Sequence, residues 1–327
     1  MFMKIPGLLA IGVLLLSLQA CAPSIYAVDP PEASTYVFDG TDSQTDSRLN
    51  FIDLRDDRYT SFTSGRLPMG LTHDGETLEP IDFLARYTIA ELAARGIPVI
   101  AATQDAIDVE INKVIMRNYR SMGFSPFTTV TMLSADVLAA DGEHRVGAFM
   151  VRGKVPVWGF EEVIEPTMNQ PLELLVKDLA AKLNMVLYGH STSDATVQLL
   201  IDRVNADPEA DLAYMDVYRL GFSNNATAVP ALVEMTRSPY EYIRLAAISS
   251  LGTINAQGEV DLLIALFSGP SIWQDKAMAI KSLGDIAVMG DDSAMTFLRN
   301  DVDAVLAGES ATGVEWTREI LGLYLRN

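Results

Sequence analysis

The residues that most often carry acid–base or metal chemistry are scarce in this chain, which has three histidines and one cysteine among 327 residues. His73 stands next to Asp74, His144 follows a predicted turn, and His190 follows a glycine. The sequence contains no His-x-x-x-His or cysteine-based zinc spacing, no glycine-rich phosphate loop and no Gly-x-Ser-x-Gly nucleophile motif. We therefore expect three solvated histidines, no catalytic or metal-binding residue, no cofactor and no enzymatic activity. An enzyme stays the alternative if one of these histidines converges with carboxylates in a pocket.

The single cysteine, Cys21, ends an apolar leader that follows Lys4 and runs from Leu8 to Leu18. A basic residue, a short apolar run and small residues before a cleavage point form the pattern of a secretory signal. The run is shorter than the roughly 17 to 25 residues that a helix needs to span a bilayer. The pattern therefore predicts a signal peptide over residues 1–20 that is removed after export.

The four residues Leu18-Gln19-Ala20-Cys21 resemble the lipobox of bacterial lipoproteins, although Gln19 is a less usual residue at its place. The resemblance implies that Cys21 becomes the first residue and carries a diacylglycerol and an amide-linked acyl chain such as palmitate. Several acyl chains together give durable membrane attachment, whereas one chain binds only marginally. In this family an aspartate after the cysteine often retains the protein at the inner membrane, so Ala22 implies the outer membrane, facing the periplasm. The alternative is an ordinary leader in which Cys21 is incidental.

Composition limits the partners of the exported chain. The formal net charge is −19 and the isoelectric point is about 4.4, which repels the phosphate backbone of nucleic acids. The same charge discourages adhesion to an anionic lipid surface, so we expect attachment to rest on the acyl chains at Cys21. With Cys21 acylated, no disulfide can form within the chain, and stability must come from apolar packing, which 49% hydrophobic residues permit.

Residues 21–48 are rich in Pro, Ser, Thr, Asp and Gly and poor in large apolar side chains. Such a composition is typical of segments that cannot bury enough apolar surface to fold. We predict a flexible tether over this stretch.

Residues 49–189 show the pattern of an α+β domain. Strands are expected over residues 51–55, 99–100, 107–112, 127–140 and 144–157, and helices over residues 80–96 and 171–189. Asp141-Gly142 lies between the last two strands and is a strong hairpin signal, because both residues tolerate positive φ. Pro80 and Pro171 suit the first turn of a helix. The order of elements predicts a mostly antiparallel sheet with two helices on one face.

Residues 194–327 repeat a pattern of helix pairs. Leu-Gly occurs at Leu220, Leu251, Leu283 and Leu321 with spacings of 31, 32 and 38 residues, and a Val-x-x-Leu pattern precedes the first three. The stretches 244–252 and 276–284 share a basic start, a small middle and a Leu-Gly end, which resembles HEAT-type repeats. The resemblance implies an all-α solenoid that binds proteins along its surface.

These observations favour a lipid-anchored envelope adaptor that binds a protein partner through its repeats. The alternative is an accessory lipoprotein of an envelope transport or assembly system, which binds a lipid or other apolar ligand between its sheet and the helix after Pro171. Acidic residues of the second half provide a face for a basic partner or are solvated helix surface: Asp202, Glu209, Asp211, Glu234, Glu241 and Glu259.

Overall fold

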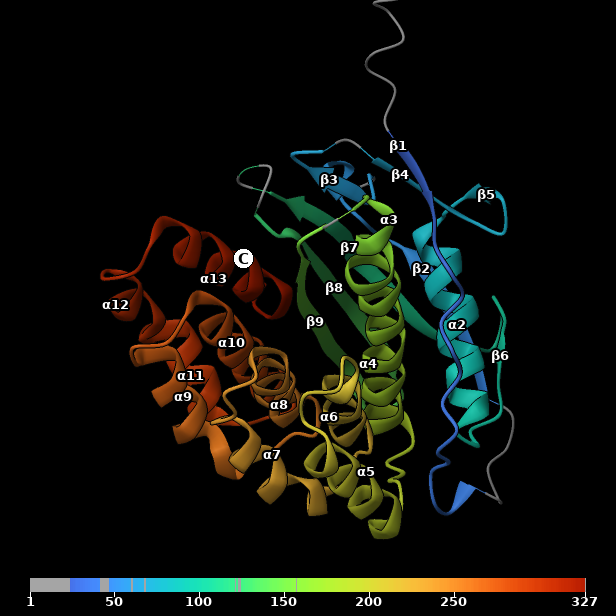
Figure 1. Ribbon diagram of the computed structural model, residues 1–327. Helices are drawn as coiled ribbons and strands as arrows, with labels where there is room; N and C mark the ends of the chain where they lie inside the picture. The colour runs from blue at the N-terminus through green and yellow to red at the C-terminus, as the bar shows by residue number, and fades with distance from the viewer. Residues whose placement is uncertain are drawn as a thin grey trace, which may run out of the picture.

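The computed structural model describes residues 24–41, 47–59, 61–67, 69–120, 122, 125–156 and 158–326. Cys21 and the predicted signal peptide lie outside the described residues. An N-terminal part built on a β-sheet and a C-terminal part built from helix pairs lie side by side and share one apolar core (Figure 1). This arrangement confirms the predicted fold class. Within the described residues, no helix is both long enough and apolar enough to cross a membrane.

The main sheet has the strand order β6-β2-β7-β8-β9, and β3 pairs with β7 beyond the end of β2. Its strands are β2 (Ser47–Asp53), β3 (Thr63–Gly65), β6 (Val99–Ala101), β7 (Ile107–Tyr119), β8 (Phe127–Ala139) and β9 (Gly142–Lys154). The three long strands β7, β8 and β9 pair antiparallel, whereas the short strands join in parallel. The predicted hairpin is confirmed, and Gly142 has a φ of +142°. Strand β7 extends seven residues beyond the prediction to Tyr119. Both of its faces are covered there, so its apolar residues do not alternate.

Two helices cover one face of this sheet, as predicted. Helix α2 (Pro80–Ala94) begins at Pro80, and α4 (Gln170–Leu187) has Pro171 in its first turn. Gly96 and Gly189 follow the two helices with φ of +91° and +71°. A residue with a Cβ rarely adopts this left-handed conformation, which explains why glycine ends each helix. The short α3 (Glu161–Ile164) and the π-helical turn η3 (Glu165–Asn169) lead into α4.

The structure differs from the prediction of a flexible tether, because residues 24–41 pack along the N-terminal part. Strand β1 (Ser24–Ala27) pairs in parallel with β4 (Met69–His73), which also pairs with β5 (Glu76–Thr77). Phe38 is 2% exposed and lies 3.7 Å from the Arg95 guanidinium. Lys177 of α4 donates to the Glu32 carbonyl at 2.6 Å. Val28 and Phe38 of this stretch are thus buried in the core, whereas Ile25 and Val37 stay exposed, a distinction that average composition does not reveal.

The described residues from 194 onward form four successive helix pairs. The outer helices are α5 (Asp194–Ala206), α7 (Val229–Met235), α9 (Val260–Ser268), α11 (Asp292–Asn300) and α12 (Val302–Leu306), and the inner helices are α6 (Ala213–Phe222), α8 (Glu241–Thr253), α10 (Trp273–Val288) and α13 (Ala311–Tyr324). Short 3-10 turns, η4 (Ala226–Ala228) and η5 (Gln257–Glu259), precede α7 and α9. Each inner helix contacts the next. Helices α5, α7 and α9 pack on the inner helix of their own pair, whereas α11 packs on α10 of the preceding pair.

The recurring Leu-Gly pairs lie on the inner helices, where the glycines allow close stacking. A Cβ at Gly221 would lie 2.6 Å from the Cβ of Ser250 on the next inner helix. Cβ atoms at Gly252 and Gly284 would collide with Ser282 and Tyr324 in the same way. Gly322 of α13 has open space around it, because α13 ends the described stack. The period seen in the sequence therefore reflects a repeated steric requirement.

The inner helices curve around the free edge of the sheet at β9 (Figure 1). Val146 faces α4, where it lines a small cavity together with Lys182. Phe149 points to the opposite face, and its ring lies 6.2 Å from the ring of Trp316 on α13. The repeats thus enclose β9 between α4 and α13. An enclosed edge strand cannot pair with another chain, which removes a common route to aggregation.

Candidate protein-binding surface

His73 is not the solvated residue that the sequence predicted, because the end of β4 packs against α2. Its side chain is 9% exposed. Nδ1 lies 3.2 Å from the Val28 carbonyl and Nε2 lies 2.5 Å from the Tyr87 hydroxyl. A carbonyl oxygen only accepts, so Nδ1 carries a proton and donates it to Val28. His73 thus joins the end of β1 to α2.

A cavity of about 240 Å³ lies beside His73 and is lined by carboxylates, so the arrangement meets part of the test for an enzyme. Its acidic residues are Asp74, Glu76, Glu79 and Asp82. The nearest, Asp74, has an oxygen 3.5 Å from Nε2 of His73 and 3.2 Å from Arg86. Because both ring nitrogens of His73 already have partners, a substrate would have to displace one of them before the ring could transfer a proton. This geometry suits a structural contact better than general acid–base catalysis.

The other two histidines belong to different parts of the fold. His144 lies at the β8–β9 turn with Nε2 2.9 Å from Asp141, and its side chain is partly exposed. His190 follows α4, where its backbone N–H and carbonyl bond the side chain of Asn184. Among the described residues, no group of three or more His, Cys, Asp or Glu side chains is arranged to hold a metal ion.

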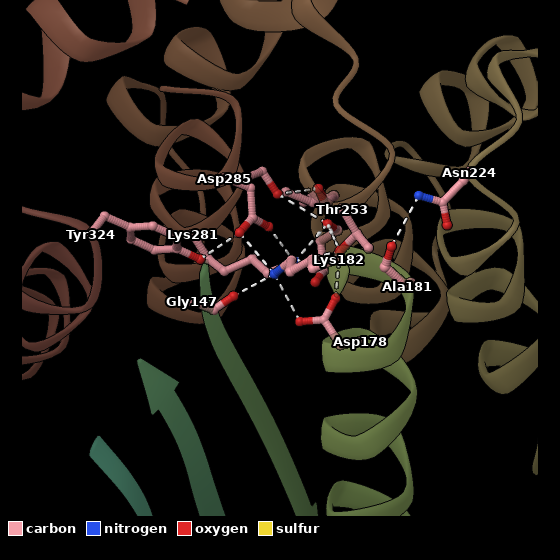
Figure 2. A network of polar contacts seen from close by, with 12 residues as sticks. Gly147, Asp178, Ala181, Lys182, Asn224, Thr253, Lys281, Asp285 and Tyr324 are labelled. Carbon is pink, nitrogen blue, oxygen red and sulfur yellow. Dashed lines mark hydrogen bonds and ion pairs between the residues drawn. The ribbon is translucent and has the colours of Figure 1, made fainter. Parts of the chain in front are cut away.

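A buried network of charged residues joins the repeats to the sheet (Figure 2). Lys182 of α4 bonds Asp178 of its own helix and Asp285 of α10, both at 2.8 Å, and also the Gly147 carbonyl of β9. Lys281 of α10 pairs with Asp285 at 2.8 Å. Two lysines and two aspartates balance in charge, as buried ions must.

Neutral groups complete this network. Thr253 of α8 donates to Asp178 and accepts from Lys281, each at 2.8 Å. The Tyr324 hydroxyl of α13 donates to Asp285 at 2.9 Å. The contacts come from α4, β9, α8, α10 and α13, so one cluster fixes three successive inner helices against the N-terminal part.

The pKa values in this network follow from burial opposed by neighbouring charge. Burial alone would raise the pKa of Asp178, but Lys182 and Lys281 outweigh it and hold that pKa below its usual value. Burial would lower the pKa of Lys182, yet Asp178 and Asp285 raise it. For Lys281 burial prevails and lowers the pKa, while burial raises the pKa of Tyr324. Asp178 and Lys182 are therefore charged at neutral pH.

Tyr242 of α8 forms hydrogen bonds with the backbone of the edge strand β9, a few residues beyond Gly147. Its hydroxyl donates to the Gly153 carbonyl at 2.9 Å and accepts from the Gly153 N–H at 3.0 Å. Beside it, the Arg152 guanidinium lies 3.7 Å from the centre of the Tyr242 ring and 4.2 Å from that of Tyr214. The inner face of the repeats is consequently occupied by the sheet of the same chain. A partner must use the outer helices, the loops or the ends of the stack.

A pocket of about 440 Å³ lies between the first and second helix pairs, where the inner helices α6 and α8 begin. Its lining residues are Pro208, Glu209, Ala210, Asp211, Tyr214, Tyr240, Glu241, Tyr242 and Ile243. We call it the acidic tyrosine pocket. The α5–α6 loop forms one wall and the start of α8 forms the other. The Tyr240 hydroxyl donates to Glu209 across the pocket at 2.8 Å.

The chemistry of the acidic tyrosine pocket suits a cation. Glu209, Asp211 and Glu241 are exposed and can pair with an incoming positive charge. Arg152 already lies over the rings of Tyr214 and Tyr242, but Tyr240 is partly exposed and its ring can attract a further cation. A lysine or arginine side chain offers both charge and apolar length. The structure thus brings together three of the six acidic residues named from the sequence. Asp202 and Glu234 are exposed on the outer helices α5 and α7, and Glu259 is half-buried in η5.

Sequence reasoning missed the buried network, although a signal for it exists. Asp178 with Lys182 and Lys281 with Asp285 are opposite charges four residues apart, a spacing that places them on one side of a helix. Both pairs stand inside otherwise apolar helices. Charged pairs at core positions predict a buried ionic contact, whereas their partners on another helix cannot be read from the sequence.

Comparison with known proteins bears on the second half of the chain. Residues 197–284 match the family model for HEAT repeats, a match that runs from α5 into α10. It supports the predicted helical repeats over the first three helix pairs. No curated protein matches the chain.

Proposed function

We propose that this protein is a non-enzymatic scaffold of the bacterial cell envelope, anchored through lipid on Cys21 and bound to a protein partner through its repeats. HEAT repeats commonly serve as scaffolds for protein interaction, which supports the general role. The observation that carries the proposal is the acidic tyrosine pocket, which lies on the repeats while their inner face is occupied by β9. A partner with an exposed lysine or arginine fits this pocket.

The lipid anchor and the outer-membrane location rest on the resemblance of Leu18–Cys21 to a lipobox and on Ala22. The intact mass of the membrane-extracted protein tests the anchor directly. We expect a chain that begins at Cys21 and carries the mass of a diacylglycerol and an acyl group. A chain that keeps residues 1–20, or lacks the added mass, contradicts the anchor and leaves the scaffold proposal standing.

Charge reversal in the acidic tyrosine pocket tests the protein-binding role. The lipidated protein is cross-linked in its own membranes and purified, and its partner is identified by mass spectrometry. We expect Glu209→Lys with Glu241→Lys to abolish recovery of the partner. The matched control is Glu234→Lys with Asp261→Lys, since both residues are exposed on outer helices and carry the same charge. Equal recovery with both double variants would contradict the pocket as the binding site.

The alternative role, binding of an apolar ligand between the sheet and α4, would require an apolar cavity large enough for that ligand. The cavity bounded by Val146, Met185 and Val288 measures about 10 Å³, roughly the space of one water molecule. A larger cleft of about 440 Å³ lies between α4 and α6, but it is lined by charged residues such as Glu165, Glu173 and Arg219. These surroundings do not favour a lipid. Native mass spectra that show co-purified lipid in the folded chain would restore this alternative.

A further inference from the structure

Exposed apolar side chains gather at the end of the molecule where the described chain begins. Six of the thirteen large apolar side chains that are exposed among the described residues lie there: Ile25, Leu67, Tyr119, Met122, Val155 and Trp158. We call this group the apolar tip. Trp158 is 93% exposed and Met122 is 69% exposed. Burial in the fold of the chain itself does not account for these residues.

Strand pairing places these residues at one edge of the sheet. Tyr119 at the end of β7 pairs with Thr128, and Phe127 at the start of β8 pairs with Lys154. Leu67 follows β3 and exchanges hydrogen bonds with Asn118 at 2.8 and 2.9 Å. The same end of the sheet therefore carries the residues near Leu67, Tyr119, Met122 and Val155.

The first described strand and the start of α3 join this edge. Ser24 of β1 pairs with Met69, which follows Leu67 closely in the chain. The ring of Phe160, next to α3, lies 4.9 Å from the rings of both Tyr26 and Phe127. Figure 1 shows β1, β3 and α3 at the same end of the molecule.

Charge is segregated at the apolar tip. In a chain of net charge −19, the described residues within 61–67, 117–128 and 153–159 include no aspartate or glutamate. They include four basic residues, Arg66, Arg117, Arg120 and Lys154. Arg117 pairs with Glu315 and Glu319 of α13, and the Arg66 guanidinium lies 5.3 Å from the centre of the Tyr119 ring. Two carboxylates follow directly downstream: Glu161 is exposed, and Glu162 accepts from the Trp158 backbone N–H at 2.8 Å. The tip thus combines apolar and basic side chains, although the molecule as a whole is strongly acidic.

The proposed anchor brings this tip to a membrane. Cys21 precedes Ser24 by three residues, and an extended chain spans at most about 3.6 Å per residue, so the acylated residue lies within roughly 11 Å of β1. The headgroup layer on each side of a bilayer is only about 5 to 8 Å thick. Because residues 24–41 are packed rather than free, the anchor cannot hold the folded part far from the lipid surface.

We propose that the apolar tip lies in the headgroup layer of the membrane that carries the anchor, with its basic residues contacting anionic lipid. This inference rests on the proposed acylation of Cys21. Tryptophan and tyrosine favour the boundary between headgroups and acyl chains, and arginine and lysine favour anionic headgroups. The acidic residues, from which the sequence predicted repulsion by anionic lipid, lie outside the three segments that form the tip. The anchored protein then has a fixed orientation rather than free rotation on a tether.

Fluorescence of Trp158 in vesicles tests this proposal. The acylated full-length protein is reconstituted into phosphatidylcholine vesicles with or without phosphatidylglycerol, and its spectrum is compared with that of Trp158→Phe to isolate Trp158 from Trp273 and Trp316. We expect the Trp158 emission to shift to shorter wavelength and to be quenched by lipids brominated near the headgroup. Trp158→Phe should fold normally because the side chain is almost fully exposed.

A charge-reversed pair tests the basic residues of the tip. We expect Arg66→Glu with Lys154→Glu to lose the part of the quenching that depends on phosphatidylglycerol. The matched control, Arg237→Glu with Arg299→Glu, changes exposed residues of the repeats by the same charge and should leave the quenching unchanged.

Each remaining outcome overturns a defined claim. If the acylated protein floats with vesicles while Trp158 keeps its aqueous spectrum and is quenched by iodide, the tip does not touch the membrane and the anchor stands. If the purified chain lacks acyl mass and does not float, the proposed anchor fails and the tip proposal fails with it. If Trp158 becomes shielded without vesicles as protein concentration rises, a second copy of the chain covers the tip instead of lipid.

Discussion

Two kinds of contact hold this molecule together, and they differ in how often they occur. Successive inner helices meet through small residues, with Gly221 against Ser250 and Gly252 against Ser282. The repeats meet the sheet through contacts that do not recur, among them the buried network around Lys182 and Asp285. The contacts between inner helices recur with the sequence period and allow the stack to be extended. The contacts with the sheet do not recur, and they determine where the stack lies. Periodic sequence therefore encodes the solenoid, and isolated charged residues encode its attachment.

The largest effect is expected when one charge of the network is removed. Lys182→Met keeps most of the side-chain volume but leaves Asp178 and Asp285 with less compensation. Breaking a buried ion pair costs about 3–5 kcal/mol, so we expect a loss of this size in the free energy of unfolding. Urea denaturation followed by circular dichroism measures it. The control is Lys154→Met, since Lys154 is exposed, and a similar loss in both variants would contradict the special role of the network.

A variant without any of the four charges sharpens the same comparison. Replacing a whole buried ionic cluster by apolar residues of similar volume is often neutral, because no unpaired charge remains. We expect Asp178→Leu, Lys182→Met, Lys281→Met and Asp285→Leu together to recover most of the stability that Lys182→Met alone loses. A quadruple variant less stable than the single variant would show that the charges, rather than their balance, are required.

A smaller loss is expected when a stacking glycine gains a methyl group. Gly252→Ala places a Cβ against Ser282 on α10, and overpacking of this kind costs about 1–3 kcal/mol. Gly322→Ala makes the same change on α13, where nothing lies within 4 Å, and alanine favours a helix over glycine. We expect Gly322→Ala to be neutral or stabilising in thermal denaturation. Equal losses at the two positions would argue against close stacking as the reason for the repeated glycine.

Removing the contact between Tyr242 and the edge of β9 is expected to lower the free energy of unfolding by about 1 kcal/mol. Tyr242→Phe keeps the ring beside Arg152 but removes the hydroxyl that bonds the N–H and carbonyl of Gly153. The net contribution of such hydrogen bonds is about 0.5–1.5 kcal/mol each. We expect faster amide hydrogen exchange at Gly153 with little change in the interior of β8. An unchanged exchange rate would show that β9 does not depend on this contact.

The smallest effect is expected in the pH dependence of the contact between α13 and the sheet. Burial would raise the pKa of Glu319, but Lys113 and Arg117 outweigh burial and hold that pKa below its usual value. A carboxyl whose pKa is lower when folded stabilises the fold above its unfolded pKa, and this contribution disappears as pH falls through the folded pKa. Glu319→Gln should therefore cost stability near neutral pH and cost less at about pH 3. The difference in free energy of unfolding between variant and parent, measured at both pH values, checks the sign.

The sequence predicted those features that depend on local chemistry. Asp141-Gly142 predicted the hairpin, Pro80 and Pro171 predicted helix starts, and the Leu-Gly period predicted the helix pairs. Each of these signals acts within a few residues or repeats at a fixed spacing.

The features that were missed depend on distant partners. Phe38 is buried because Arg95 and the α4–α5 junction meet it, and His73 is buried because Tyr87 of α2 lies beside it. The sequence predicted that Phe38 belongs to a flexible tether and that His73 is exposed to solvent. The enclosure of β9 by the repeats has no sequence signal of its own, since it arises only when the two parts are packed together.

Hydrogen–deuterium exchange of the full-length chain tests most directly whether the repeats and the sheet form one body. Amides of β9, α8 and α10 should exchange at similar slow rates, and Lys182→Met should accelerate all three together. Such a result means that the inner face of the repeats is closed by the sheet and that a partner must bind outside it. Fast exchange of α8 and α10 with β9 still protected would contradict this account, because the repeats would then open independently and expose their inner face.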